Sequence, residues 1–184
     1  MDGQQLQDLV QTLEGAVTQS GESLVSLSEA SPLLLVFLRH AGCTFCREAL
    51  GDIARARPAI DRTGVRIVLV HMGDSGAIAK FIEKNALGKV DSICDPEQKL
   101  YRAFGLKRGS FLQLLGPKVL WRGFLAGVVR GHGIGAPAAD SSQMPGLFLL
   151  NKGSIVRRFR HRSASDRPDY ASICESLAES GSGA

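Results

Sequence analysis

Continuous apolar runs alternate with segments of helical periodicity through the first half of the chain. The runs at 32–40 and 66–71 predict two strands covered on both faces of a sheet. Around them, apolar residues recur at the three- and four-residue spacing of amphipathic helices. These positions are Leu6, Leu9, Val10, Leu13 and Val17 in an N-terminal helix expected over 3–19, then Ala49, Leu50, Ile53 and Ile60, and then Ile78, Phe81 and Ile82. The order predicts parallel strands joined by helical crossovers.

Shorter features refine this pattern. Residues 23–27 are interpreted as a short edge strand, and Pro58 is expected to end or kink the helix in which it lies. Asp95 followed by Pro96 predicts the start of another helix, with the Asp95 side chain as its cap and Gly105 as its end.

The second half of the chain has a different pattern. Glycines divide residues 107–143 into short segments, in which one amphipathic helix is expected between Val119 and Val128. The strand-like runs 146–150 and 154–159 flank an Asn-Lys-Gly turn, which predicts a β-hairpin. A closing helix is expected from the spacing of Tyr170, Ile173, Cys174 and Leu177.

Together these elements predict an α/β fold with a mixed central sheet, helices on both faces and a helical insert. We expect residues 1–179 to form a single domain that includes the insert at 107–143, and residues 180–184 to form a flexible tail.

The composition limits the function classes. Hydrophobic residues make up 44% and charged residues 22%, an ordinary globular balance. No apolar run approaches the roughly 18 residues of a membrane span, and the N-terminus lacks a signal-peptide pattern. We therefore expect a cytoplasmic protein that does not associate with membranes.

The net charge of +4 is unevenly placed, because residues 98–139 contain no acidic side chain. Nucleic-acid recognition motifs are absent and aromatic residues amount to 6%, so nucleic acid is not expected as a partner. The basic segment is either an ordinary solvated face or a rim that attracts anionic substrates or an acidic reductase partner.

Two cysteines carry the strongest chemical signal. Cys43 and Cys46 form a C-x-x-C motif directly between a predicted buried strand and a predicted helix. The start of a helix favours a thiolate, because its backbone N–H groups and dipole present positive charge. Arg39, His40 and Arg47 add nearby basic side chains. The motif predicts a reversible disulfide in which Cys43 is the more exposed and more acidic thiol.

Another reading of these residues is a metal-binding module. Cys43, Cys46 and His40 could hold zinc or copper(I), although the sequence shows no obvious fourth ligand. Cys94 is interpreted as a small packed residue near a helix start, and Cys174 as part of the apolar face of the last helix. His71 is interpreted as a satisfied polar residue at the end of a strand.

Three segments resemble the peroxiredoxin-like branch of the AhpC/TSA group in the thioredoxin superfamily, which includes selenoprotein-L-like redox proteins. They are Val36–Cys46, Asp95–Leu106 and Gln143–Leu150, within a match over about residues 22–178. The resemblance implies a thioredoxin-like fold, a peroxidatic or exchange-active thiolate at Cys43 and a resolving thiol at Cys46. Supporting roles are expected for Arg39, His40, Thr44, Phe45, Met144 and Pro145, and Pro145 would match a cis-proline that faces the cysteines.

The resemblance implies a thiol peroxidase that needs no bound cofactor, takes a peroxide or disulfide substrate and is reset by an external dithiol such as a thioredoxin or glutathione system. An alternative is a thioredoxin-type disulfide reductase without peroxidase activity. Typical relatives have a threonine at the position of His40 and an arginine at that of Pro145. We therefore expect slow reduction of hydrogen peroxide and faster reduction of larger apolar hydroperoxides, with the insert 107–143 forming an apolar wall beside the thiols.

Overall fold

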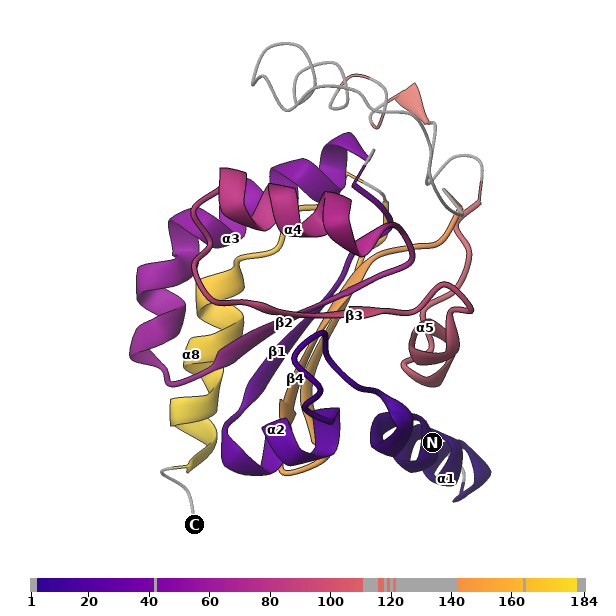
Figure 1. The fold of residues 1–184 in the computed structure, drawn as a ribbon, viewed down its shortest axis with the longest axis vertical. Helices are drawn as coiled ribbons and strands as arrows, with labels where there is room; N and C mark the ends of the chain where they lie inside the picture. Colours follow the sequence, from indigo (N-terminus) through magenta and orange to yellow (C-terminus); the bar gives the residue numbers. More distant parts are fainter. Residues whose placement is uncertain are drawn as a thin grey trace.

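A five-stranded mixed sheet forms the centre of the molecule, in the order β3-β2-β1-β4-β5 (Figure 1). The computed structural model describes residues 3–41, 43–110, 116, 117, 119, 121, 142–163 and 165–181. The strands are β1 (Leu33–Phe37), β2 (Arg66–His71), β3 (Asp91–Cys94), β4 (Gly146–Asn151) and β5 (Ser154–Arg160). β1 pairs in parallel with β2 and antiparallel with β4, which confirms the mixed sheet.

Helices cover both faces of this sheet (Figure 1). They are α1 (Gly3–Gly15), α2 (Leu24–Ala30), α3 (Thr44–Arg62), α4 (Ser75–Lys84), α5 (Lys99–Ala103) and α8 (Tyr170–Gly181). α3, α4 and α8 pack on one face, and α1, α2 and α5 pack on the other.

β1 supplies apolar side chains to both faces, as its continuous apolar run predicts. Leu34 and Val36 face α3, whereas Leu35 and Phe37 face α5. Phe37 packs against the rings of Tyr101, Phe104 and Phe148 at centroid distances of 5.0–5.5 Å. Side chains thus pack on both faces of the central strand just before the cysteine motif.

Several expected elements differ from the structure. Residues 23–27 were expected as a strand, but Ser23 is the N-cap of helix α2 and the following residues form its first turn. The Ser23 hydroxyl accepts a hydrogen bond from the N–H of Ser26, and the helix buries Leu24 and Leu27 on one face. α1 ends at Gly15 rather than at residue 19, and Val17 instead pairs with Ser23 in an isolated bridge.

The helix α3 runs through Pro58 to Arg62, so this proline does not end it. Pro58 lies on the exposed side of α3, where the carbonyl that loses its hydrogen bond can be hydrated. The strand β3 was not predicted from the sequence, because a run of Asp91, Ser92, Ile93 and Cys94 carries little apolar signal.

The predicted hairpin is present, whereas the predicted cap is met in part, because the N-cap position of α5 is Gln98 rather than Asp95. The Asp95 carboxylate accepts hydrogen bonds from the N–H groups of Lys99 and Leu100, at 2.9 and 2.8 Å, although α5 starts at Lys99 rather than at Pro96. In the hairpin, Lys152 and Gly153 both have positive φ, at 47° and 68°, as a two-residue type I′ turn requires.

Most of the insert lies outside the described residues. The helix expected between Val119 and Val128, and the apolar wall expected beside the thiols, therefore remain predictions. Val119 itself is described, and it is buried. The tail after Gly181 is also outside the described residues.

Candidate active site

The cysteine motif continues directly from the central strand. After β1, the Leu38 N–H still bonds to the Val70 carbonyl at 2.8 Å, and the next residues turn back so that the Cys43 N–H bonds to the His40 carbonyl at 3.1 Å. Cys43 is then the N-cap of α3, and its sulfur accepts from the N–H of Cys46 at 3.4 Å. The motif therefore lies where the sequence predicts, at a strand-to-helix junction.

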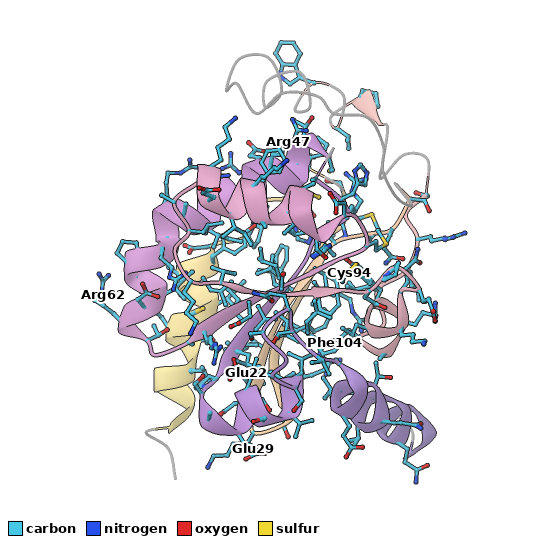
Figure 2. The ribbon with its side chains drawn as sticks, in the orientation of Figure 1. Glu22, Glu29, Arg47, Arg62, Cys94 and Phe104 are labelled. Atoms are coloured by element: carbon cyan, nitrogen blue, oxygen red, sulfur yellow. The ribbon has the colours of Figure 1, made fainter. Side chains whose placement is uncertain are left out.

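Arg47 fixes this loop from the first turn of α3 (Figure 2). Its Nε donates to the Ala41 carbonyl at 2.7 Å, and its guanidinium lies 4.7 Å from the centre of the Phe81 ring on α4. The loop is held at both ends by backbone bonds and in the middle by this side chain, so the sulfurs have a defined position.

Arg39 contacts both sulfurs of the pair. Its guanidinium Nη2 donates to Cys43 Sγ at 2.9 Å, and its backbone N–H donates to Cys46 Sγ at 3.2 Å. All three residues are buried, and the exposed fractions of Cys43 and Cys46 are 7% and 5%. Exposure therefore hardly distinguishes the two thiols, although Cys43 is slightly the more exposed, in the expected direction.

Acidity does distinguish them, in the predicted direction. A hydrogen bond from the Cys46 thiol and the positive charge of Arg39 outweigh burial and lower the pKa of Cys43 to about 5. The pKa of Cys46 is raised well above its ordinary value, because its proton is held by Cys43 and because it is fully buried. At neutral pH the site holds one thiolate, at Cys43, and one thiol, at Cys46.

His40 lies beside the pair as a neutral imidazole. Burial lowers its pKa below the ordinary value, against the opposite influence of the Cys43 charge. Its Cβ packs against Gly73, where an added Cβ would lie 3.2 Å away. Within the residues that the structure describes, no group of three or more His, Cys, Asp or Glu side chains is arranged to hold a metal ion.

The segment 142–145 runs along residues 106–109 and enters β4. The Gly109 N–H bonds to the Ser142 carbonyl at 2.7 Å, and the Met144 N–H bonds to the Lys107 carbonyl at 3.1 Å. The peptide bond before Pro145 is trans, so the cis-proline expected there is wrong. The segment reaches β4 as an extended chain, which is compatible with the ordinary preference of X–Pro bonds for trans.

A narrow cavity of about 20 Å³, enough for one water molecule, lies between this segment and Cys46. It is lined by Arg39, Phe45, Cys46, Pro145 and His161, among others. Phe45 and Pro145 thus lie where a supporting role was expected, whereas Met144 is buried next to them and Thr44 is the first, half-buried residue of α3.

Two residues of this region were missed in the sequence. His161 follows β5, and burial lowers the pKa of its imidazole to about 4. Tyr101 lies beneath the loop, where its hydroxyl donates to the carbonyls of Leu38 and Val70 at the ends of β1 and β2. No local motif marks either residue, because both reach the site through tertiary packing.

The other cysteines and His71 lie apart from this pair. Cys174 is fully buried on α8, which agrees with a core role, and burial raises the pKa of its thiol. Cys94 is exposed at the end of β3, contrary to the expectation of a packed residue. His71 is buried, and its Nδ1 bonds to the Gly73 carbonyl at 3.0 Å.

A family model described as AhpC/TSA antioxidant enzyme matches residues 52–165. The chain belongs to this family. The matched residues begin after both cysteines, so the family assignment is independent of the C-x-x-C motif.

Relatives of this AhpC/TSA protein include the prostamide/prostaglandin F synthase of Sus scrofa, which is 29% identical over 90% of this chain and 83% of the relative. The prostamide/prostaglandin F synthase of Salmo salar is also 29% identical, over 86% of this chain and 81% of the relative. Peroxiredoxin-like 2C of Bos taurus is 24% identical over 77% and 66% of the two chains.

Solved peroxiredoxin structures share the fold of this AhpC/TSA protein. The bacterioferritin comigratory protein of Xanthomonas campestris superposes with a TM-score of 0.56 at 15% identity, over 90% of this chain and 87% of the other. Peroxiredoxin 6 of Arenicola marina gives a TM-score of 0.61 at 12% identity, over 90% and 69%. The fold is that of peroxiredoxin-like members of the thioredoxin superfamily, and the family supports a thiol redox function. No helix among the described residues is both long and apolar enough to cross a membrane.

Proposed function

We propose that this protein is a thiol peroxidase in which Cys43 attacks the O–O bond of a hydroperoxide and Cys46 resolves the product. The observation that carries the proposal is the double contact of Arg39. Its guanidinium holds a buried Cys43 thiolate, and its backbone N–H holds the neighbouring Cys46 sulfur. One thiol is thus prepared as the nucleophile and the other stays protonated until it is needed.

The first step forms a bond between Cys43 Sγ and the terminal peroxide oxygen. The O–O bond breaks, an alkoxide leaves, and it takes a proton from the solvent to become the alcohol. The Arg39 guanidinium, 2.9 Å from Cys43 Sγ, is the cation placed to stabilise the departing oxygen. We assign to Arg39 the charge stabilisation that typical relatives obtain from the groups replaced here by His40 and Pro145.

In the second step Cys46 Sγ attacks the sulfenic acid at Cys43, which yields the disulfide and one water molecule. An external dithiol then reduces the disulfide by exchange and becomes a disulfide itself. The solved structure of a yeast mitochondrial 1-Cys peroxiredoxin is described with glutathione and thioredoxin systems, which supports testing both reductants.

Single-turnover oxidation tests the proposal. The fully reduced protein is mixed with hydrogen peroxide, cumene hydroperoxide or oxidised glutathione, and Cys43 is followed by mass spectrometry. We expect cumene hydroperoxide to react faster than hydrogen peroxide, because the site lacks the usual peroxide-binding threonine and arginine and a larger apolar hydroperoxide would gain binding energy from the insert 107–143. Ready oxidation by the disulfide alone would identify a thioredoxin-type reductase instead.

Cysteine variants separate the two steps. In Cys46→Ser the first oxidation should persist and a sulfenic acid at Cys43 should be trapped by dimedone, because the resolving thiol is absent. Cys43→Ser should abolish oxidation. Cys94→Ser is the matched control and should leave both steps within about twofold. Trapping of dimedone at Cys94 in the wild type would contradict the assignment.

A further inference from the structure

A concave basic surface lies between α1, α5 and β5, on the face of the sheet opposite to the thiols. We call it the basic trough. It has a volume of about 670 Å³, within the range of small-molecule sites. It is lined by Thr12, Lys99, Arg102, Ala103, Phe104, Gly105, Lys107, Phe148, Ile155, Arg158 and Arg160. Phe104, labelled in Figure 2, marks its place beside α5.

Among the residues that the structure describes, the lining contains five cationic side chains and no carboxylate. Lys99 pairs with Glu97 outside the lining, at 2.8 Å. Arg102 and Arg160 donate to the backbone carbonyls of Glu97 and Phe104, at 2.7 and 3.0 Å. Such bonds hold the two guanidinium groups in place without cancelling their charge, so the trough is a preformed region of positive potential.

Gly105 keeps one of these cations at the end of the trough. It has a φ of +66°, and a Cβ at this position would lie 2.6 Å from Nη2 of Arg160. The absence of a side chain thus lets Arg160 reach the carbonyl of Phe104.

Two further cavities share lining residues in a series from the trough to Cys46. A cavity of about 350 Å³ shares Gly105, Lys107 and Arg160 with the trough and extends to Pro145 and His161. Pro145 and His161 also line the narrow cavity that reaches Arg39 and Cys46. Leu106 and Met144 make part of the connecting wall apolar.

We propose that the basic trough binds the oxyanion of an amphiphilic organic acid whose other end reacts at the Cys43–Cys46 pair. The planar fork of an arginine matches a carboxylate with two parallel hydrogen bonds. The half-buried Ile155 and Ala103 beside the cations accept an apolar stem. The binding itself is independent of the thiol chemistry, whereas the reaction at the far end rests on the proposed function.

Binding is tested on Cys43→Ser protein with octanoate and 1-octanol, followed through backbone amide shifts in NMR spectra. We expect octanoate to bind at least tenfold more tightly than 1-octanol, with the largest shifts around Gly105. Lys107→Gln/Arg158→Gln should weaken octanoate binding about tenfold. The control Arg62→Gln/Lys84→Gln removes the same charge from exposed positions at the C-terminal ends of α3 and α4, and should not change the affinity. Equal binding of acid and alcohol, or equal losses in both variants, would overturn the proposal.

Turnover then identifies which reaction partner carries the anion. One pair of compounds is an eight-carbon hydroperoxide with a terminal carboxylate and its methyl ester. The other is 8-mercaptooctanoate and 8-mercapto-1-octanol, tested as reductants of the preformed disulfide. If the acid of the first pair reacts faster than its ester, and this preference disappears in Lys107→Gln/Arg158→Gln, the anion belongs to the oxidant. If the acid of the second pair shows the same behaviour relative to its alcohol, the anion belongs to the reductant.

The two proposals fail in different ways. If the thiol chemistry is wrong, octanoate still binds while no compound turns over. If the trough is wrong, turnover proceeds at the same rate on each acid and its neutral partner.

Discussion

Arg39 is the residue on which the chemistry of the thiol pair depends. Its side chain and its backbone contact different sulfurs, so one residue both stabilises the Cys43 anion and orients Cys46. Its own pKa is raised despite burial, because both sulfurs favour the protonated guanidinium. Arg39 therefore stays a cation over the pH range in which Cys43 titrates.

Replacing Arg39 by Gln should raise the pKa of Cys43 from about 5 by roughly one unit or more. The thiolate is the form that reacts, so alkylation by iodoacetamide should increase as the pH rises through this pKa and then level off. The midpoint of the pH–rate curve, measured by mass spectrometry, should move to higher pH in Arg39→Gln. Arg62→Gln removes a charge from the exposed C-terminal end of α3, at the opposite end of the helix from the sulfurs, and should leave the midpoint in place. An equal shift in both variants would show that only the general positive potential matters.

At the scale of elements, the sequence predicts best where burial is continuous. β1 and β2 were found because each is an unbroken apolar run, and the hairpin because its turn has a specific chemistry. β3 was missed because its pattern is polar, although its register with β2 buries Asp91 and Ser92. The N-cap serine of α2 was overlooked, since a short alternation of Ser and Leu fits the period of a strand as well as that of a helix.

Asp95 is the capping residue with the clearest expected effect. Asp95→Ala should lower the free energy of unfolding by about 2 kcal/mol, because a buried carboxylate that satisfies two backbone N–H groups is lost. Asp74→Ala removes an exposed cap that also accepts two N–H groups at the start of α4, and should cost about 1 kcal/mol. Urea unfolding followed by circular dichroism measures both. A smaller loss in Asp95→Ala than in Asp74→Ala would contradict the importance of burial here.

At the scale of the whole molecule, the site combines parts that are distant in the sequence. The motif itself could be predicted, because the strand, the cysteines and the helix are consecutive. His161 and Tyr101 could not, since they reach this region only through the hairpin and through α5. The trans Pro145 was also misjudged, because the register of 142–145 against 106–109 is set by tertiary hydrogen bonds.

Arg167 links the segment before α8 to α3. It donates to the buried carboxylate of Glu48 at 2.8 Å and also pairs with Asp52. Arg167→Ala should lower the free energy of unfolding by about 2–3 kcal/mol, because it removes one partner from a buried ion pair. Arg55 also pairs with Asp52, but its side chain is 66% exposed, so Arg55→Ala should cost less than about 1 kcal/mol. Calorimetric unfolding of both variants measures the difference, and similar losses would show that the link is not structural.

The position of β1 between two neighbours has a consequence for the kinetics of access to the thiols. Every residue of this strand is at most 2% exposed, and the Leu38 and Arg39 backbones continue its hydrogen bonding to β2. The reactive loop is thus attached to the part of the protein that unfolds last. The amides of β1 should therefore exchange with deuterium only through global unfolding. Reagents must then reach Cys43 through rearrangement of side chains in the native state. Its alkylation rate should consequently stay constant as urea is raised toward the unfolding transition, while amide exchange in β1 accelerates.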